Sequence, residues 1–180
     1  MLPTSMFLLA ISTLCLAVPP TQGHHNHLAR APGPRKGGSF GGEGGKGFDD
    51  LPAVGPNPRL TSLTLRGANR LDAISFTLAS GKTFYHGGSG GNARTISLGR
   101  NEYITSVRLC RETKYGFTLY EKDRIFYARV TTNTGRSIEA GRATYSCKVD
   151  NAPQGFAIVA AHGRSGREVD KLGFVYAPRI

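Results

Sequence analysis

The sequence predicts an all-β domain from residue 60 onward. Apolar residues there alternate with polar or small ones at a period of two, as in strands that bury one face. Glycine-rich turns separate these segments, and no window of helical length has the apolar spacing of an amphipathic helix. About ten short strands at this spacing indicate a sandwich, a barrel or a prism.

The expected strands share this alternation, and their apolar positions follow in chain order: Ile74-Phe76-Leu78, Ile96-Leu98, Val107-Leu109, Phe117-Leu119, Phe156-Ile158-Ala160 and Leu172-Phe174-Tyr176. Three turns combine a small residue, a glycine and a basic residue: Ser80-Gly81-Lys82, Thr134-Gly135-Arg136 and Ser165-Gly166-Arg167. These turns suggest approximate threefold symmetry within one domain, although a coincidental likeness of hairpin turns explains them equally well. Their unequal intervals exclude a solenoid of fixed period.

The N-terminus resembles a secretory signal peptide. The apolar run from Phe7 to Val18 is too short for a membrane-spanning helix and has the length of a signal-peptide core. We expect residues 1–23 to be removed by cleavage after Gly23, with Ala17 as the alternative, rather than to act as a membrane anchor. The mature protein is therefore expected to be secreted, without stable membrane insertion.

Residues 24–43 read as a flexible, basic leader, and residues 44–180 as the folded domain. The leader is rich in Gly, Pro and His and has no apolar periodicity. Its histidines (His24, His25, His27) could bind copper or nickel weakly, but no cysteine or carboxylate completes a site. We therefore expect no metal and no cofactor.

Two cysteines remain after the signal peptide, Cys110 and Cys147. In an oxidising compartment such a pair is expected to form a disulfide, while two buried free thiols stay open as the alternative.

The formal net charge of +11 belongs wholly to the mature protein, because residues 1–23 carry no charged side chain. Such a balance favours polyanionic partners, which are sulfated or uronic polysaccharides, anionic lipid surfaces or nucleic acid. For a secreted protein, nucleic acid is the least accessible of these, and we expect none.

Each sequence pattern that resembles an enzyme site lacks a feature that the site would need. The glycine spacing of the dinucleotide-binding motif occurs in Gly42-x-Gly44-x-x-Gly47. However, no apolar strand precedes it, and nearby prolines prevent the helix that should follow. The histidines of the domain, His86 and His162, lack the spacing of a metal pair. Glu168 and Asp170 lie on one face of an extended strand, whereas a glycosidase needs carboxylates that flank the bond. We expect no catalytic residues.

Five short motifs occur in the order found in the jacalin-related lectins, which the chain resembles from residue 44 to about residue 178. They are Gly44-Gly45-Lys46-Gly47-Phe48-Asp49-Asp50, Glu102-Tyr103-Ile104, Thr132-Asn133-Thr134-Gly135, Gly155-Phe156, and the closing stretch from Gly163 to Gly173 with its G-x-x-x-D loop. The chain is similar to secreted single-domain members such as the zymogen-granule-type lectins. The resemblance implies a β-prism of three four-stranded antiparallel sheets and a carbohydrate-binding function.

The resemblance also implies a sugar site, for which we expect Gly45, Lys46, Lys122, Gly166, Arg167, Glu168, Val169 and Asp170. The Asp170 carboxylate can accept two hydroxyl donors in charge-assisted bonds. Gly166 is expected to permit a tight turn that points the amides of Arg167 and Glu168 at the ligand. Gly45, which has no side chain, permits close approach from the facing loop.

The departures from the family pattern bear on specificity. Galactose-preferring members place aromatic rings where this chain has Arg167 and Glu168, so the stacking platform is absent and a mannose/glucose-type site is expected. Lys46, Lys122 and Arg167 could ring the pocket with positive charge, which favours acidic or sulfated glycans at or beside it. The alternative function is a basic, polyanion-binding matrix protein with a vestigial sugar pocket. A second site at Gly135–Glu139 and a homo-oligomer that would add avidity both stay open.

Overall fold

A computed structural model describes residues 32–113 and 123–179 of the chain. The expected signal peptide, the first part of the leader, the strand at Phe117–Leu119 and Lys122 lie outside these residues. Within them the one helical element is a single 3-10 turn, η1 (Leu51–Ala53), and no helix has the length and apolarity that a membrane span requires.

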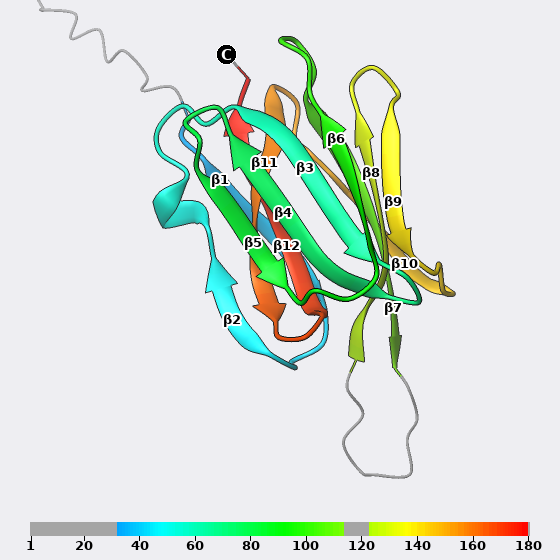
Figure 1. Cartoon of the computed structure of the whole chain (residues 1–180). Helices are drawn as coiled ribbons and strands as arrows, with labels where there is room; N and C mark the ends of the chain where they lie inside the picture. Colours follow the sequence, from blue (N-terminus) through cyan, green and yellow to red (C-terminus); the bar gives the residue numbers. More distant parts are fainter. Residues whose placement is uncertain (1–31, 114–122, 180) are drawn as a thin grey trace, which may run out of the picture. The chain divides into compact units, whose positions relative to one another are not determined.

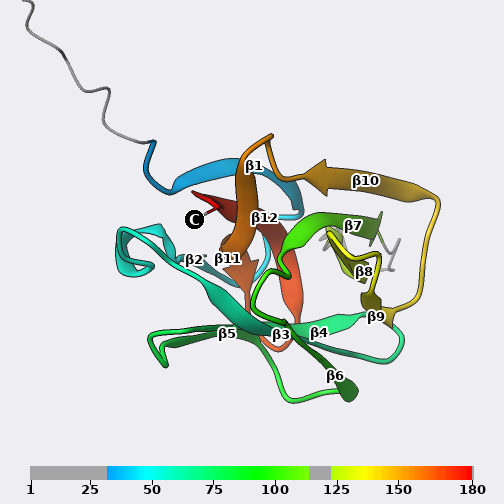
Figure 2. The ribbon, with the colours of Figure 1, turned by 90° about the horizontal axis from the view of Figure 1, so that it is seen from above.

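The described residues form three four-stranded antiparallel sheets, as predicted (Figures 1 and 2). The first sheet contains, in order of pairing, β1 (Arg35–Gly41), β12 (Val169–Pro178), β11 (Phe156–Ser165) and β2 (Lys46–Asp49). The second contains β10 (Ser146–Asn151), β7 (Ile104–Thr113), β8 (Asp123–Thr132) and β9 (Ser137–Gly141). The third contains β5 (Thr83–Gly87), β4 (Leu71–Leu78), β3 (Leu60–Gly67) and β6 (Asn92–Ser97).

The three sheets surround a common hydrophobic core (Figure 2). Side chains from every sheet are fully buried in it, among them Phe76, Val107 and Phe174. A single residue pair, Ile104 with Ile158, joins the first two sheets along one edge. The prism is therefore held by side-chain packing between sheets and by backbone hydrogen bonds within each of them.

The folded domain begins before residue 44, and this corrects the expected boundary. Strand β1 lies inside the stretch predicted to be a flexible leader, and its backbone pairs with β12 from Arg35 to Gly41. Its RKGGSFG sequence lacks apolar alternation, but glycine is what the location requires, because a Cβ atom at Gly37 would overlap the ring of Tyr176. Composition alone therefore could not identify β1 as a strand, because its glycines are needed for the close contact with Tyr176.

Three glycines mark the internal repeat of the prism: Gly41, Gly87 and Gly141. All three have positive φ angles, of 123°, 119° and 85°. A Cβ atom at each would overlap a backbone carbonyl, which belongs to Asp170, Asp72 and Phe126, respectively. The amide that follows each glycine donates to that same carbonyl, at 2.9, 2.9 and 3.0 Å. Asp170, Asp72 and Phe126 therefore occupy equivalent positions in the three sheets.

The three turns predicted as the repeat are not equivalent to one another. The turns at Gly81 and Gly135 connect β4 to β5 and β8 to β9 at one end of the strands, whereas the turn at Gly166 connects β11 to β12 at the other end (Figure 1). The similarity of their sequences reflects common hairpin chemistry, which was the alternative interpretation.

A disulfide between Cys110 and Cys147 joins β7 to the edge strand β10. The two residues are direct cross-strand partners, with their Cα atoms 4.0 Å apart, and Cys110 is fully buried. The bond fixes β10, which pairs with a single neighbour, to the second sheet.

Removing this bond should lower the free energy of unfolding. In the chain-entropy model, a loop of this length contributes about 3–4 kcal/mol. We expect Cys110→Ala/Cys147→Ala to lose that amount in urea denaturation, and we expect a reductant to destabilise the native protein but not the double variant. Equal unfolding free energies for the native protein with and without reductant would contradict this prediction.

Candidate functional site

The closing hairpin presents a carboxylate at its base. Ser165 pairs with Val169 across the turn between β11 and β12, and the amide of Gly166 donates to the carbonyl of Glu168 at 2.9 Å. Asp170, the second residue of β12, is 4% exposed, and Val169 is fully buried in the core. Val169 therefore contributes backbone alone to any ligand, whereas the carboxylate of Asp170 lies just below the surface.

The opening glycine loop packs directly on this carboxylate. A Cβ atom at Gly44 would overlap Asp170 Oδ1, and one at Gly45 would lie 2.6 Å from Asp170 Oδ2 and 2.5 Å from the carbonyl carbon of Ser165. Gly45 also has a φ of +63°, a conformation that side chains disfavour. Any other residue here would push the loop away from Asp170, so both the contact and the conformation require glycine.

Arg164 holds the glycine loop in place. Its Nε donates to the carbonyls of Glu43 and Gly44 at 3.0 and 2.9 Å, and its Nη2 donates to the carbonyl of Gly45 at 2.9 Å. The planar guanidinium thus binds three successive carbonyls at once, which a lysine ammonium would not reproduce. Sequence reasoning missed this role, because Arg164 looked like one basic residue of a turn.

The other side of the glycine loop is anchored by Asp50. This side chain is 4% exposed, bonds to Nε2 of His86 at 2.9 Å, and accepts the amide of Ala161 at 3.1 Å. Phe48 stacks on the His86 ring at a centroid distance of 3.6 Å. The residues that follow the loop are therefore fixed to both β5 and β11.

The assembled site combines acceptors with free donors. No backbone carbonyl of the described residues accepts a hydrogen bond from the turn amides of Arg167 and Glu168. These residues lie three and two positions before Asp170 in the chain. Lys46 is paired across the sheet with Ser165, and the side chains of both Lys46 and Arg167 are exposed at the rim. Lys122, the third predicted rim cation, lies outside the described residues.

The turn has two features that the sequence did not predict. The Glu168 side chain, 13% exposed, is held by ion pairs with Arg70 and Arg124, so it braces the turn and does not face a ligand. Gly166 is not among the glycines with positive φ, and a Cβ atom there would meet only Gly45 Cα, at 3.7 Å. The conformation that only glycine adopts readily belongs to Gly45 in the facing loop.

The third sheet carries a second copy of this arrangement around Asp72. Asp72 is 6% exposed and follows the turn between β3 and β4, in which Gly67 pairs with Leu71 as Ser165 does with Val169. A Cβ atom at Gly90 would lie 2.9 Å from Asp72 Cγ, and Gly91 has a φ of +62°.

Arg66 repeats the role of Arg164 in this second copy. Its Nη1 donates to the carbonyls of Ser89, Gly90 and Gly91 at 3.0, 3.3 and 2.7 Å. Arg70 Nε lies 3.5 Å from Asp72 Oδ1, and the same atom forms a closer ion pair with Glu168 of the first site. Burial raises the pKa of the Asp72 carboxyl, and Arg70 acts in the opposite direction.

The described part of the second sheet has no third copy, since Phe126 occupies the position of the carboxylate. This corrects the location considered for a second site, Gly135–Glu139. That segment connects β8 to β9 at the other end of the strands, and Glu139 accepts a hydrogen bond from the Tyr127 hydroxyl at 2.6 Å. Burial and this bond raise the pKa of Tyr127 to about 12.

Residues 37–175 match the Jacalin-like lectin domain, well over half of the chain. The chain belongs to the jacalin-like lectin family. Proteins of this family bind carbohydrates and are not enzymes, so the expected lectin assignment and the expected absence of catalysis are confirmed at this level.

Named relatives span the same jacalin-like domain. Horcolin of Hordeum vulgare is 30% identical over 152 residues, which are 81% of this chain and 98% of horcolin. A mannose-binding jacalin-related lectin from Ananas comosus has a TM-score of 0.68 and 27% identity, and the alignment covers 82% of this chain and 100% of the pineapple lectin. Malaysian banana lectin gives the same values.

Substituting Gly45 should test the packing of this jacalin-like site. We expect Gly45→Ala to cost at least about 2 kcal/mol more in unfolding free energy than Gly81→Ala, because both glycines have positive φ but a Cβ atom at Gly81 has no atom within 4 Å. Gly81→Ala thus measures the conformational strain alone. Equal costs in urea denaturation would show that the loop does not press on Asp170.

Proposed function

We propose that this jacalin-like lectin binds mannose- or glucose-type glycans at the site formed by Asp170 and the loop of Gly44 and Gly45. The observation that carries the proposal is a carboxylate placed against side-chain-free backbone and beside free turn amides. The pineapple relative, which shares 27% identity and the fold, is described as mannose binding, and this supports the proposed specificity.

Vicinal hydroxyl groups of a sugar match this arrangement. Two hydroxyls can donate to the oxygens of Asp170, while the amides of Arg167 and Glu168 donate to a ring or hydroxyl oxygen. No aromatic side chain lies within the turn, so a stacking contribution of the kind that favours galactose is missing. Such a site should bind a monosaccharide weakly, with a dissociation constant in the high micromolar to millimolar range, or about −4 to −6 kcal/mol.

The second copy, at Asp72, is proposed as a weaker sugar site. Its glycines and Arg66 reproduce the first site, which favours the same ligand class. However, the Arg70 guanidinium competes with sugar hydroxyls for one oxygen of Asp72, and this should lower the affinity. Two sites in one chain would let a monomer cross-link glycans without any oligomer.

Asparagine substitutions separate the two sites, because the amide keeps the shape but loses the charge and one acceptor. In calorimetric titrations with methyl α-mannoside, we expect Asp170→Asn to reduce the stronger binding at least about thirtyfold, since charge-assisted hydrogen bonds contribute roughly 1.5–3 kcal/mol each. We expect Asp72→Asn to leave the stronger binding unchanged and the double variant to bind nothing.

The two variants are matched controls for each other, because both carboxylates are buried to a similar degree at equivalent positions. A loss of mannoside binding in Asp72→Asn equal to that in Asp170→Asn, with both variants folded by circular dichroism, would contradict the proposed ranking. Full affinity in Asp170→Asn would overturn the proposed site.

We further propose that the protein acts outside the cell. The signal-peptide pattern of residues 1–23 supports this, and so does the Cys110–Cys147 disulfide, since such bonds persist in oxidising compartments.

The second candidate function is binding of acidic or sulfated glycans by a basic surface. Arg108 and Arg129 are direct cross-strand partners with exposed side chains, and Glu139, opposite Arg129 on β9, offsets part of their charge. Like charges placed opposite one another repel, so a bound polyanion would relieve this repulsion. Affinity for such a ligand falls as salt rises, whereas affinity for a neutral mannoside does not.

A further inference from the structure

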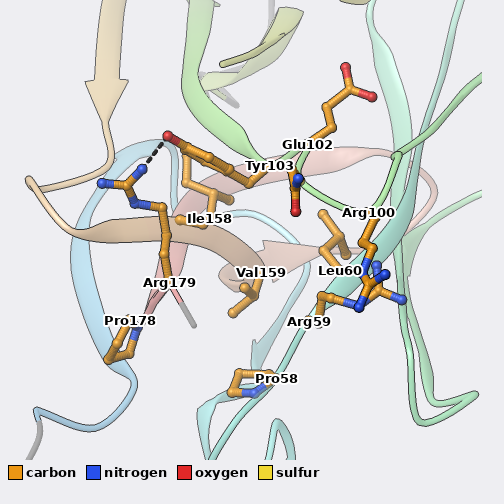
Figure 3. A pocket seen from close by; sticks show the side chains of 12 residues that line it. Pro58, Arg59, Leu60, Arg100, Glu102, Tyr103, Ile158, Val159, Pro178 and Arg179 are labelled. Atoms are coloured by element: carbon orange, nitrogen blue, oxygen red, sulfur yellow. Dashed lines mark hydrogen bonds between the residues drawn. The ribbon is translucent and has the colours of Figure 1, made fainter. Parts of the chain in front are cut away.

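A cavity lies at the end of the prism opposite to the two carboxylate sites. It has a volume of about 240 Å³ and opens where β12 ends, beside Pro178 and Arg179 (Figure 3). Asp170 stands at the start of the same strand, so roughly 25 Å of extended chain separate the two places. No residue of the cavity takes part in the proposed sugar sites.

The floor of the cavity is aliphatic. Leu60, Ile158 and Val159 are almost completely buried and turn toward the cavity, while Pro58 and Pro178 form its walls (Figure 3). A floor of this kind offers no hydrogen-bond acceptor to a sugar hydroxyl. It suits a compact apolar group, because burial there removes apolar surface from water.

Among the described residues that line the cavity, the one carboxylate is Glu102, and it is already engaged within the protein. It accepts hydrogen bonds from Thr134 at 2.8 Å, from the Gly99 amide at 3.2 Å and from Arg136 at 2.7 Å. The hydrogen bond from Thr134 contributes most to lowering the pKa of Glu102 to about 2. The Glu102 carboxylate is therefore ionised, and Arg136 balances its charge. Glu102 therefore does not neutralise Arg59 and Arg100, which also line the cavity.

Three arginines stand around the rim. Arg179 lies over the ring of Tyr103 at 4.7 Å and donates to the Tyr103 hydroxyl. Arg59 and Arg100 are exposed, and neither forms an ion pair with a carboxylate in the described part of the chain. Both lie on the side of the cavity opposite to Arg179 and Tyr103 (Figure 3).

We propose that this cavity binds a small organic acid, in which a carboxylate is attached to a compact aromatic or aliphatic body. The apolar body would rest on Leu60, Ile158 and Val159, and the carboxylate would pair with Arg59 and Arg100, whose charges have no other partner among the described residues. Arginine suits this role, since its planar fork binds both oxygens of a carboxylate. A polyanionic chain fits less well, because the charges flank a small apolar hollow and do not form an extended stripe.

The test uses 4-phenylbutyrate as the probe, with 4-phenylbutanamide as its uncharged counterpart, in titrations of the full mature protein followed by amide chemical shifts. We expect saturable binding of the acid, with shifts at Tyr103, Ile158 and Arg179, and at least tenfold weaker binding of the amide. Arg59→Gln/Arg100→Gln should weaken binding of the acid at least tenfold and leave mannoside binding unchanged.

The matched control is Arg94→Gln/Arg142→Gln, which removes the same charge from exposed arginines outside the cavity. It should bind the acid as the native protein does. The proposal is overturned if the acid does not saturate the protein, if the amide binds equally well, or if the control variant loses as much affinity as the rim variant. Because mannoside binding is read on the same samples, failure here is distinguishable from failure of the sugar site.

Discussion

The close packing of a side-chain-free loop on a buried carboxylate is the contact on which the proposed function depends. Asp170 can lie just beneath the surface and still meet a ligand only because Gly44 and Gly45 leave room for its two oxygens. The loop keeps this position because the Arg164 fork takes up three of its carbonyls, which would otherwise turn toward water. One carboxylate, two glycines and one arginine therefore define a rigid acceptor surface on a strand end and not on a freely moving loop.

The same constraint explains which parts of the prism repeat. The equivalent positions Asp170, Asp72 and Phe126 all accept a loop amide through their carbonyls, so the backbone repeats in all three sheets. A carboxylate, a glycine pair and an arginine fork occur together in two of them. The backbone contact is thus a requirement of the fold, whereas the side chains above it differ from sheet to sheet.

Much of this architecture could be predicted from sequence. Period-two alternation identified β4, β7, β11 and β12, and the ordered motifs predicted three four-stranded sheets. Strand β1 could not be predicted, because its glycines serve contact with Tyr176 and carry no alternation of their own. The role of Glu168 was also inaccessible, since its partners Arg70 and Arg124 are remote in the chain and only the folded prism brings them together.

Arg66 and the glycines near residue 90 had a signal that sequence reasoning overlooked. Residues 87–91 read GGSGG and residues 41–45 read GGEGG, so each stretch has two glycine pairs and ends just before a strand. Aligning these two glycine-rich stretches with each other, in the register of their sheets, places Asp72 and Asp170 at equivalent positions. Aligning the three turn tripeptides does not.

The most direct test of the central claim is a titration of the mature protein with methyl α-mannoside, followed by backbone amide chemical shifts at low and at high salt. We expect shifts at Gly44, Gly45 and Arg167 to Asp170, with weaker ones around Gly91 and Asp72, and a dissociation constant that does not change with salt. Shifts confined to the exposed arginines of β7 and β8, or binding that disappears at high salt, would contradict it and assign recognition to the basic surface.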